Sequence, residues 1–173
     1  YRQFAKPTNC CGRHRILLRQ SSVSARVQRW RQRAPQSAKT IARSNYDEFF
    51  KENKHELYEE NIVHGLILGY LKLDYEDLKG YIESFIPYIN NWAVCDMTVS
   101  NLKKYVKNIN KDSIFEDIKR YIKDSNPWIN RFGYVMLLEY FIEEKYIDEI
   151  FELCKKYKDE YYVKMSIAWL ISF

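Results

Sequence analysis

A stripe of side chains that could carry chemistry runs along the segment from Trp92 to Lys107. Trp92, Asp96, Ser100, Lys103 and Lys107 fall at helical spacing, so one helix face would be aromatic, then acidic, hydroxylic and basic. A carboxylate one turn beyond an indole on such a face would point into a cleft or groove. The structural alternative is that Asp96 pairs with a cation or caps a neighbouring helix, while Trp92 packs in the core. Spacing alone favours this alternative.

A second group of candidates is centred on Arg131. After residue 46 the sequence has 15 Lys but only two Arg, so this Arg indicates a role that a point charge cannot fill, namely a bidentate contact to phosphate or carboxylate. The alternative is an ion pair with an acid such as Asp96. Trp128 lies one turn before Arg131, and Lys164 and Trp169 lie in the last predicted helix. For Trp169 the alternative is again packing in the core.

A set of amphipathic helices must position these residues. From residue 45 onward, apolar residues recur three and four positions apart, as in the run Tyr75, Leu78, Ile82. The pattern predicts helices over residues 46–53, 56–72, 75–88, 91–107, 113–124, 127–142, 145–157 and 160–172.

The predicted helices recur in pairs. The first members begin near residues 55, 91, 127 and 160, and the second members begin near residues 75, 111 and 145. Trp92 and Trp128 are 36 residues apart, each just inside its helix. A helix pair recurring at this period predicts an all-α fold, an α-solenoid of antiparallel helix pairs. An irregular helical bundle is the alternative.

The charge is unevenly distributed along the chain. Residues 1–46 contain 11 Lys and Arg and no acid, whereas residues 47–173 contain 17 Lys and Arg and 23 acids, a net charge of −6. Residues 1–37 therefore form an atypical Arg-rich segment with three open interpretations: a transit peptide, a nucleic-acid-binding tail, or non-native sequence from a shifted reading frame. We expect a helical-repeat domain over residues 38–173, incomplete at its C-terminal end, in a chain that is a fragment because it begins with Tyr1.

Composition excludes several classes of protein. Nine Gly and Pro residues are too few for a β-sandwich or barrel, and the longest apolar stretch, residues 62–71, is too short to cross a membrane. The four Cys and three His residues lack the spacing of a disulfide scaffold or a zinc site. The composition therefore predicts a protein of a reducing compartment with no metal site and no membrane partner. We further expect a monomer that uses no organic cofactor.

Three short signatures resemble those of a known family. They are Asn91-Trp92-x-x-x-Asp96, Trp128-x-x-Arg131 and Tyr162-Val-Lys-Met-Ser-Ile-Ala-Trp169. Over about residues 44–173 the chain is similar to the AlkD-like DNA alkylation repair family, whose members are HEAT-like-repeat DNA glycosylases of base excision repair. The resemblance implies removal of N3- and N7-alkylated purines from duplex DNA without flipping of the base. It also implies a bacterial, cytoplasmic protein that acts on the nucleoid.

The resemblance implies a role for each candidate residue. Asp96 would be the catalytic carboxylate, which stabilises the oxocarbenium-like sugar and positions the attacking water. Trp92 and Trp169 would pack on the deoxyribose of the lesion. The DNA backbone would be contacted by Arg131, Lys103, Lys107 and Lys164.

A second hypothesis is a non-catalytic helical-repeat module that binds a protein or a DNA structure. The net charge of −6 over residues 47–173 favours the module. The combination of Asp96, Trp92, Arg131 and Trp169 disfavours it. Geometry separates the two hypotheses, because the glycosylase requires these four side chains to converge on one concave face.

Overall fold

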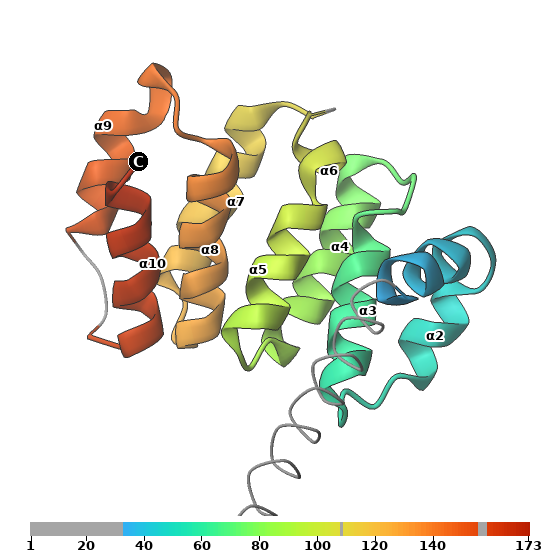
Figure 1. Cartoon of the computed structure of the whole chain (residues 1–173). Coiled ribbons are helices and arrows are strands. Elements are labelled where there is room, and N and C mark those ends of the chain that lie inside the picture. Colours follow the sequence, from blue (N-terminus) through green and yellow to red (C-terminus); the bar gives the residue numbers. More distant parts are fainter. Residues whose placement is uncertain (1–32, 108, 156–158) are drawn as a thin grey trace, which may run out of the picture.

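The computed structural model describes residues 33–107, 109–155 and 159–173, and it is helical throughout, with no strand in those residues (Figure 1). A first helix covers residues 33–44. The others are α2 (Tyr46–Glu52), α3 (Tyr58–Leu68), α4 (Tyr75–Phe85), the 3-10 turn η1 (Ile86–Tyr88), α5 (Trp92–Asn101), α6 (Lys103–Lys107), α7 (Lys111–Lys123), α8 (Pro127–Tyr140), α9 (Glu144–Cys154) and α10 (Tyr161–Ile171). The prediction of an all-α fold is confirmed.

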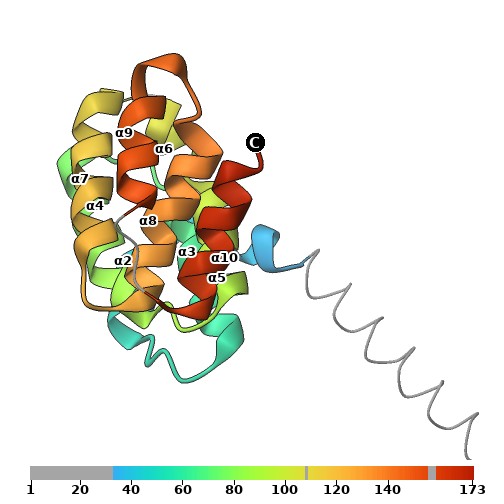
Figure 2. The same cartoon turned by 90° about the vertical axis from the view of Figure 1, so that its left-hand side faces the viewer.

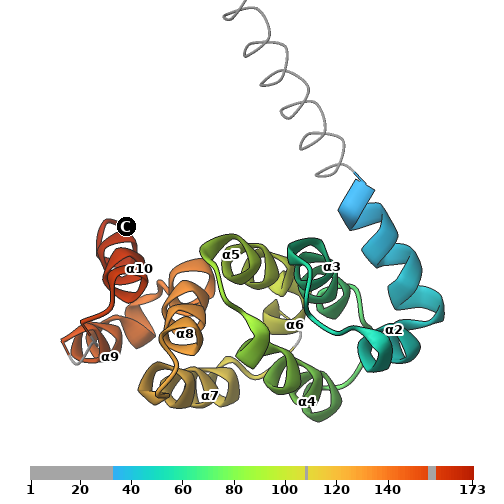
Figure 3. The same ribbon diagram turned by 90° about the horizontal axis from the view of Figure 1, so that it is seen from below.

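The helices lie in two layers. Viewed from below, α3, α5, α8 and α10 form one row and α4, α7 and α9 form the other (Figure 3). The side view shows the same separation, with α4 and α7 on one side and α5 and α10 on the other (Figure 2). Within the first row α3 packs against α5, α5 against α8, and α8 against α10, while α7 packs against α8 across the layers. The first row therefore carries all the candidate residues except Lys103 and Lys107, which lie on α6.

Asparagine and aspartate side chains fix where several helices begin. The backbone N–H of Val94 donates to the Asn91 side chain at 3.0 Å, and that of Trp128 donates to Asn126 at 2.9 Å, directly before Pro127. An N-cap oxygen satisfies an N–H that has no partner within the helix, so these residues set the register of α5 and α8. Residue 113 was a predicted helix start, but α7 begins two residues earlier, because Asn110 caps it instead.

The predicted helix over residues 91–107 is wrong as a single element. At Leu102 the backbone N–H donates to Val99 O at 2.9 Å, and this tighter turn separates α5 from α6. Leu102 is fully buried, so the break places an apolar side chain in the core. The single stripe expected from Trp92 to Lys107 is continuous only as far as Ser100.

Helix α8 lies at the centre of the core. Its residues 129–138 are all buried, because it has neighbours on both sides in its own row and α7 behind it. A helix that is covered on nearly every side must satisfy any polar side chain internally. Arg131 lies in this buried stretch and therefore needs partners.

Helices α3 and α5 approach very closely at Gly65. A Cβ atom built on Gly65 would lie 1.9 Å from the Thr98 hydroxyl oxygen, so any side chain there would push the two helices apart. The Thr98 hydroxyl itself donates to Val94 O at 2.7 Å, which holds it in place within α5. This contact fixes the distance between the first two helices of the row.

The first described helix crosses the boundary predicted at residue 37. Residues 33–44 are continuously helical, and Ala34 and Ala38 are both buried in the core. Most of the Arg-rich segment, residues 1–32, lies outside the described residues, so its origin and the domain boundary stay predictions. In the part of the chain that is described, no helix is both long and apolar enough to cross a bilayer.

Candidate functional site

The side chains of Asp96 and Arg131 form a bidentate ion pair between α5 and α8. Arg131 Nε donates to Asp96 Oδ1 at 3.2 Å, and Nη2 lies 3.0 Å from Oδ1 and 2.9 Å from Oδ2. The guanidinium is 6% exposed, whereas the carboxylate is 21% exposed. The pair therefore presents its acidic member to solvent and keeps its basic member beneath the surface.

Helix α5 positions Asp96 through its capped start and its buried face. Asn91 caps the helix, so that Asp96 lies in the second turn. Val94, Cys95 and Val99 are fully buried and hold the opposite side of the helix against the core. Burial raises the pKa of the Cys95 thiol and the Asp96 charge raises it further, so this cysteine stays protonated and acts as a small apolar residue.

A third contact ties Arg131 to α10. Its Nη1 donates to the backbone carbonyl of Tyr162 at 2.9 Å. The Tyr162 ring also packs on Trp128, with 4.8 Å between the ring centroids. The guanidinium therefore joins three neighbouring helices of one row, which is a use for a planar fork that lysine could not replace. Of the two roles inferred for Arg131 from sequence, pairing with a carboxylate is the one seen here.

The two tryptophans predicted to pack on a sugar are exposed. Trp92 is 54% exposed one turn before Asp96, and Trp169 is 40% exposed on α10, two turns beyond Tyr162. Packing in the core, the alternative considered for both, is not what the structure shows. Large aromatic side chains at such exposure are available for contact with a ligand. Their catalytic roles stay predictions.

The three lysines predicted to contact phosphates lie in different settings. Lys103 and Lys107 are exposed on α6, beyond the break at Leu102. Lys164 is exposed on α10 and forms an ion pair with Asp159. The structure brings the side chains of Asp96 and Arg131 into contact. None of the three lysines is hydrogen-bonded to either of them in the described residues.

Sequence reasoning missed the carbonyl of Tyr162 as a partner of Arg131. A backbone acceptor has no side-chain signature, so no signal in the sequence could have identified it. Ser100, counted as part of the stripe, donates its hydroxyl to Asp96 O at 2.8 Å within α5. That bond is a local helix contact and adds nothing to the ion pair.

The residues described around the pair offer no set of metal ligands. Among the residues that the structure describes, no group of three or more His, Cys, Asp or Glu could hold a metal ion. The chemistry open to the site is that of a carboxylate held by a guanidinium. Such a carboxylate can stabilise a developing cation or orient a water molecule.

One family of known proteins matches most of the chain. The model of a protein family described as "DNA alkylation repair enzyme" matches residues 16–172. No curated protein and no solved structure matches the chain significantly. The family match spans nearly the whole sequence, and this chain belongs to the DNA alkylation repair enzyme family.

Proposed function

We propose that this protein is a DNA glycosylase that releases N3- and N7-alkylated purines from duplex DNA. The observation that supports it most directly is the Asp96–Arg131 pair, in which an oriented carboxylate remains partly open to solvent. Family membership supports a role in DNA repair, and the oriented carboxylate supports the particular reaction.

Alkylation of a ring nitrogen makes the base cationic, so the base can leave without a general acid. The sugar then develops oxocarbenium character, and an anion beside it lowers the barrier. Asp96 would supply this anion and position the attacking water. Arg131 would keep the carboxylate in one orientation, so that little reorganisation is needed when the positive charge develops.

The exposed indoles of Trp92 and Trp169 would pack against the deoxyribose of the lesion. An indole face also favours a nearby cation, by about 0.5–1 kcal/mol at an exposed site. Lys103, Lys107 and Lys164 would contact phosphates on the flanking backbone. If Arg131 also contacts the DNA backbone, it must use the Nη1 hydrogen that it does not donate to Tyr162.

The helix row itself supports a repeat architecture. Helices α3, α5, α8 and α10 begin at residues 58, 92, 127 and 161, a spacing of 34 to 35 residues. We propose that α3, α5 and α8 pair with α4, α7 and α9 of the second row as HEAT-like repeats of an α-solenoid, and that α10 begins a further repeat. The row would then form the surface on which duplex DNA lies.

A non-catalytic binding module is the second candidate. Two observations favour it: the net charge of −6 over residues 47–173, and the hydrogen bonds by which the buried Arg131 guanidinium is held to Asp96 and Tyr162. A module of this kind would bind DNA and release no base.

The test is to incubate the protein with methylated duplex DNA and measure the free bases that appear. We expect 3-methyladenine and 7-methylguanine to be released by the wild type and not by the variant Asp96→Asn. Asp148→Asn serves as the matched control, because Asp148 is exposed on α9, away from the pair. Binding of the DNA without release of a base by the folded wild type would overturn the glycosylase and leave the module.

A further inference from the structure

Two adjoining cavities lie at the end of the helices where α3 connects to α4. The larger has a volume of about 760 Å³, and the smaller has a volume of about 330 Å³. Both are lined by residues 70–73 and by Lys104 at the start of α6. Neither is lined by Asp96, Arg131 or the exposed tryptophans, so they are separate from the pair described above.

Four cations surround the smaller cavity and its junction with the larger one. Lys39 and Arg43 come from the first helix, Lys72 from the α3–α4 connection and Lys104 from α6. All four are exposed, and none forms an ion pair with any residue in the described part of the chain. Some exposed cations elsewhere, such as Lys145, do have a carboxylate partner. Four unpaired cations from three separate elements form a strongly attractive site for an anion.

The acid that lines the larger cavity does not form an ion pair with these cations. Asp74 lines the larger cavity, but its carboxylate accepts the backbone N–H of Asp77 at 3.0 Å as the N-cap of α4. The Asp74 carboxylate therefore interacts with the N-terminus of α4, where the helix dipole stabilises a negative charge. The cations of the smaller cavity keep their net positive charge.

The larger cavity has aromatic and aliphatic walls. Tyr75 and Tyr105 line it with their rings stacked, 5.9 Å between centroids and 15° between planes. Tyr75 is held by a hydrogen bond from its hydroxyl to Asp117, and Tyr70 and Leu78 complete the apolar lining. Volumes of this size accommodate small organic ligands, and aromatic walls suit a planar ring.

We propose that these two cavities together bind a nucleoside phosphate, with the phosphates on the four cations and the base against the tyrosines. The same chemistry could come from a free nucleotide or from the 5′-phosphorylated end of a DNA strand. The proposal does not depend on the glycosylase activity, because it uses none of the residues of the Asp96–Arg131 pair.

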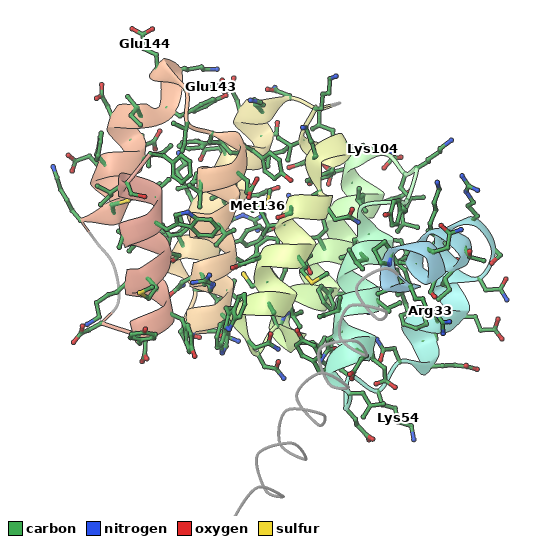
Figure 4. The ribbon with its side chains drawn as sticks, in the orientation of Figure 1. Arg33, Lys54, Lys104, Met136, Glu143 and Glu144 are labelled. Carbon is green, nitrogen blue, oxygen red and sulfur yellow. The ribbon has the colours of Figure 1, made fainter. Side chains whose placement is uncertain are left out.

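The test measures binding by calorimetry to the full chain, with ATP, inorganic triphosphate, adenosine and a 5′-phosphorylated trinucleotide as probes. We expect the double variant Lys72→Glu/Lys104→Glu to weaken nucleotide binding by roughly tenfold or more. Both residues are exposed and unpaired, so the variant should retain the thermal stability of the wild type. Lys54→Glu is the matched control, since Lys54 is an exposed lysine at the opposite end of the helices from Lys104 (Figure 4).

Tighter binding of ATP than of the trinucleotide would identify a free nucleotide, and the reverse order would identify a strand end. Either order supports the proposal if inorganic triphosphate and adenosine each bind at least fivefold more weakly than the tighter of the two nucleotide probes. The proposal is overturned if the wild type binds neither nucleotide probe, if the double variant binds as tightly as the wild type, or if triphosphate alone binds as well as ATP. Base release from methylated DNA is measured for the same variants. If the double variant still releases bases but no longer binds nucleotides, the nucleotide site and the glycosylase activity are tested independently.

Discussion

Arg131 and Asp96 lie on neighbouring helices, and the guanidinium donates to both oxygens of the carboxylate while remaining almost entirely buried. Its third contact, to the Tyr162 carbonyl, extends the connection to α10. The same side chain therefore orients the candidate catalytic carboxylate and fastens three helices of one row. Function and stability are coupled at this residue, and experiments on it must measure both.

The ion pair should make a measurable contribution to the free energy of unfolding. Asp96→Asn leaves the Arg131 guanidinium buried without its counter-charge, and we expect a loss of about 1–3 kcal/mol. Arg131→Lys removes the fork and should cost a similar amount. Urea unfolding of the two single variants and the double variant gives the coupling energy between the two side chains. Each single variant loses the pair interaction, so the sum of the two losses counts it twice, whereas the double variant loses it once. Strictly additive effects would show that the pair does not stabilise the fold.

Two glycines provide a matched test of the packing between α3 and α5. Gly65→Ala should destabilise the protein by about 1–3 kcal/mol, because its Cβ would overlap Thr98. Gly80→Ala should instead stabilise it by about 0.5–1 kcal/mol, since nothing lies within 4 Å of a Cβ in this exposed turn of α4. Thermal unfolding of both variants is the measurement. Equal changes in the two would contradict the close approach of α3 and α5.

The buried His64 should make stability depend on pH. Burial lowers the pKa of His64 from 6.5 to about 3, and its ring is stacked between Phe50 and Phe85 at 4.0 and 4.3 Å. Its Nδ1 lies 3.3 Å from Asn53 Nδ2, whereas its Nε2 has no hydrogen-bond partner in the described structure. A proton on this ring would lie between two phenyl rings and near the His55 ring, whose centroid is 5.1 Å away and which lowers the pKa further.

Because the unfolded chain binds the proton more readily than the native chain, His64 lowers the free energy of unfolding as pH falls below about 6.5. The slope would approach about 1.4 kcal/mol per pH unit between that value and the native pKa. His64→Phe should fit the aromatic stack and remove this contribution. Urea unfolding between pH 7 and pH 4.5 compares the two proteins, and parallel curves would contradict the assignment.

The salt dependence of DNA binding should report on Lys103 and Lys107. Each phosphate contact adds about 0.9 to the magnitude of the slope of log affinity against log salt concentration. The double variant Lys103→Gln/Lys107→Gln should therefore reduce that magnitude by about 1.8. Lys145→Gln is the control, because Lys145 is already paired with Asp112. Fluorescence anisotropy with a duplex over a range of salt concentrations gives the slopes. An unchanged slope in the double variant would show that these lysines do not contact the backbone.

The helical fold could be predicted from sequence because its signals are local. Apolar periodicity and caps such as Asn126 before Pro127 depend only on neighbouring residues, and most predicted helices agree with the structure within a few residues. The break at Leu102 could not be predicted in this way. It places a buried leucine against helices that are distant in the sequence, and tertiary packing overrides the local pattern there.

The candidate site was only partly accessible to sequence reasoning. The rarity of Arg identified Arg131, and Asp96 was considered as its partner, but spacing could not decide between a phosphate and a carboxylate. The exposure of Trp92 and Trp169 depends on which side of each helix its neighbours cover. The unpaired cations around the α3–α4 connection come from three elements, and only the fold brings them together.

The most direct test of the glycosylase proposal is the single-turnover rate of 7-methylguanine release from a duplex with one lesion. The wild type should release the base, and Asp96→Asn should be slower by about 10²–10³-fold while Asp148→Asn is unchanged. Circular dichroism and thermal unfolding would establish that both variants are folded. A folded Asp96→Asn variant that releases the base as fast as the wild type would contradict the assignment of Asp96. No release by the folded wild type would contradict the glycosylase itself.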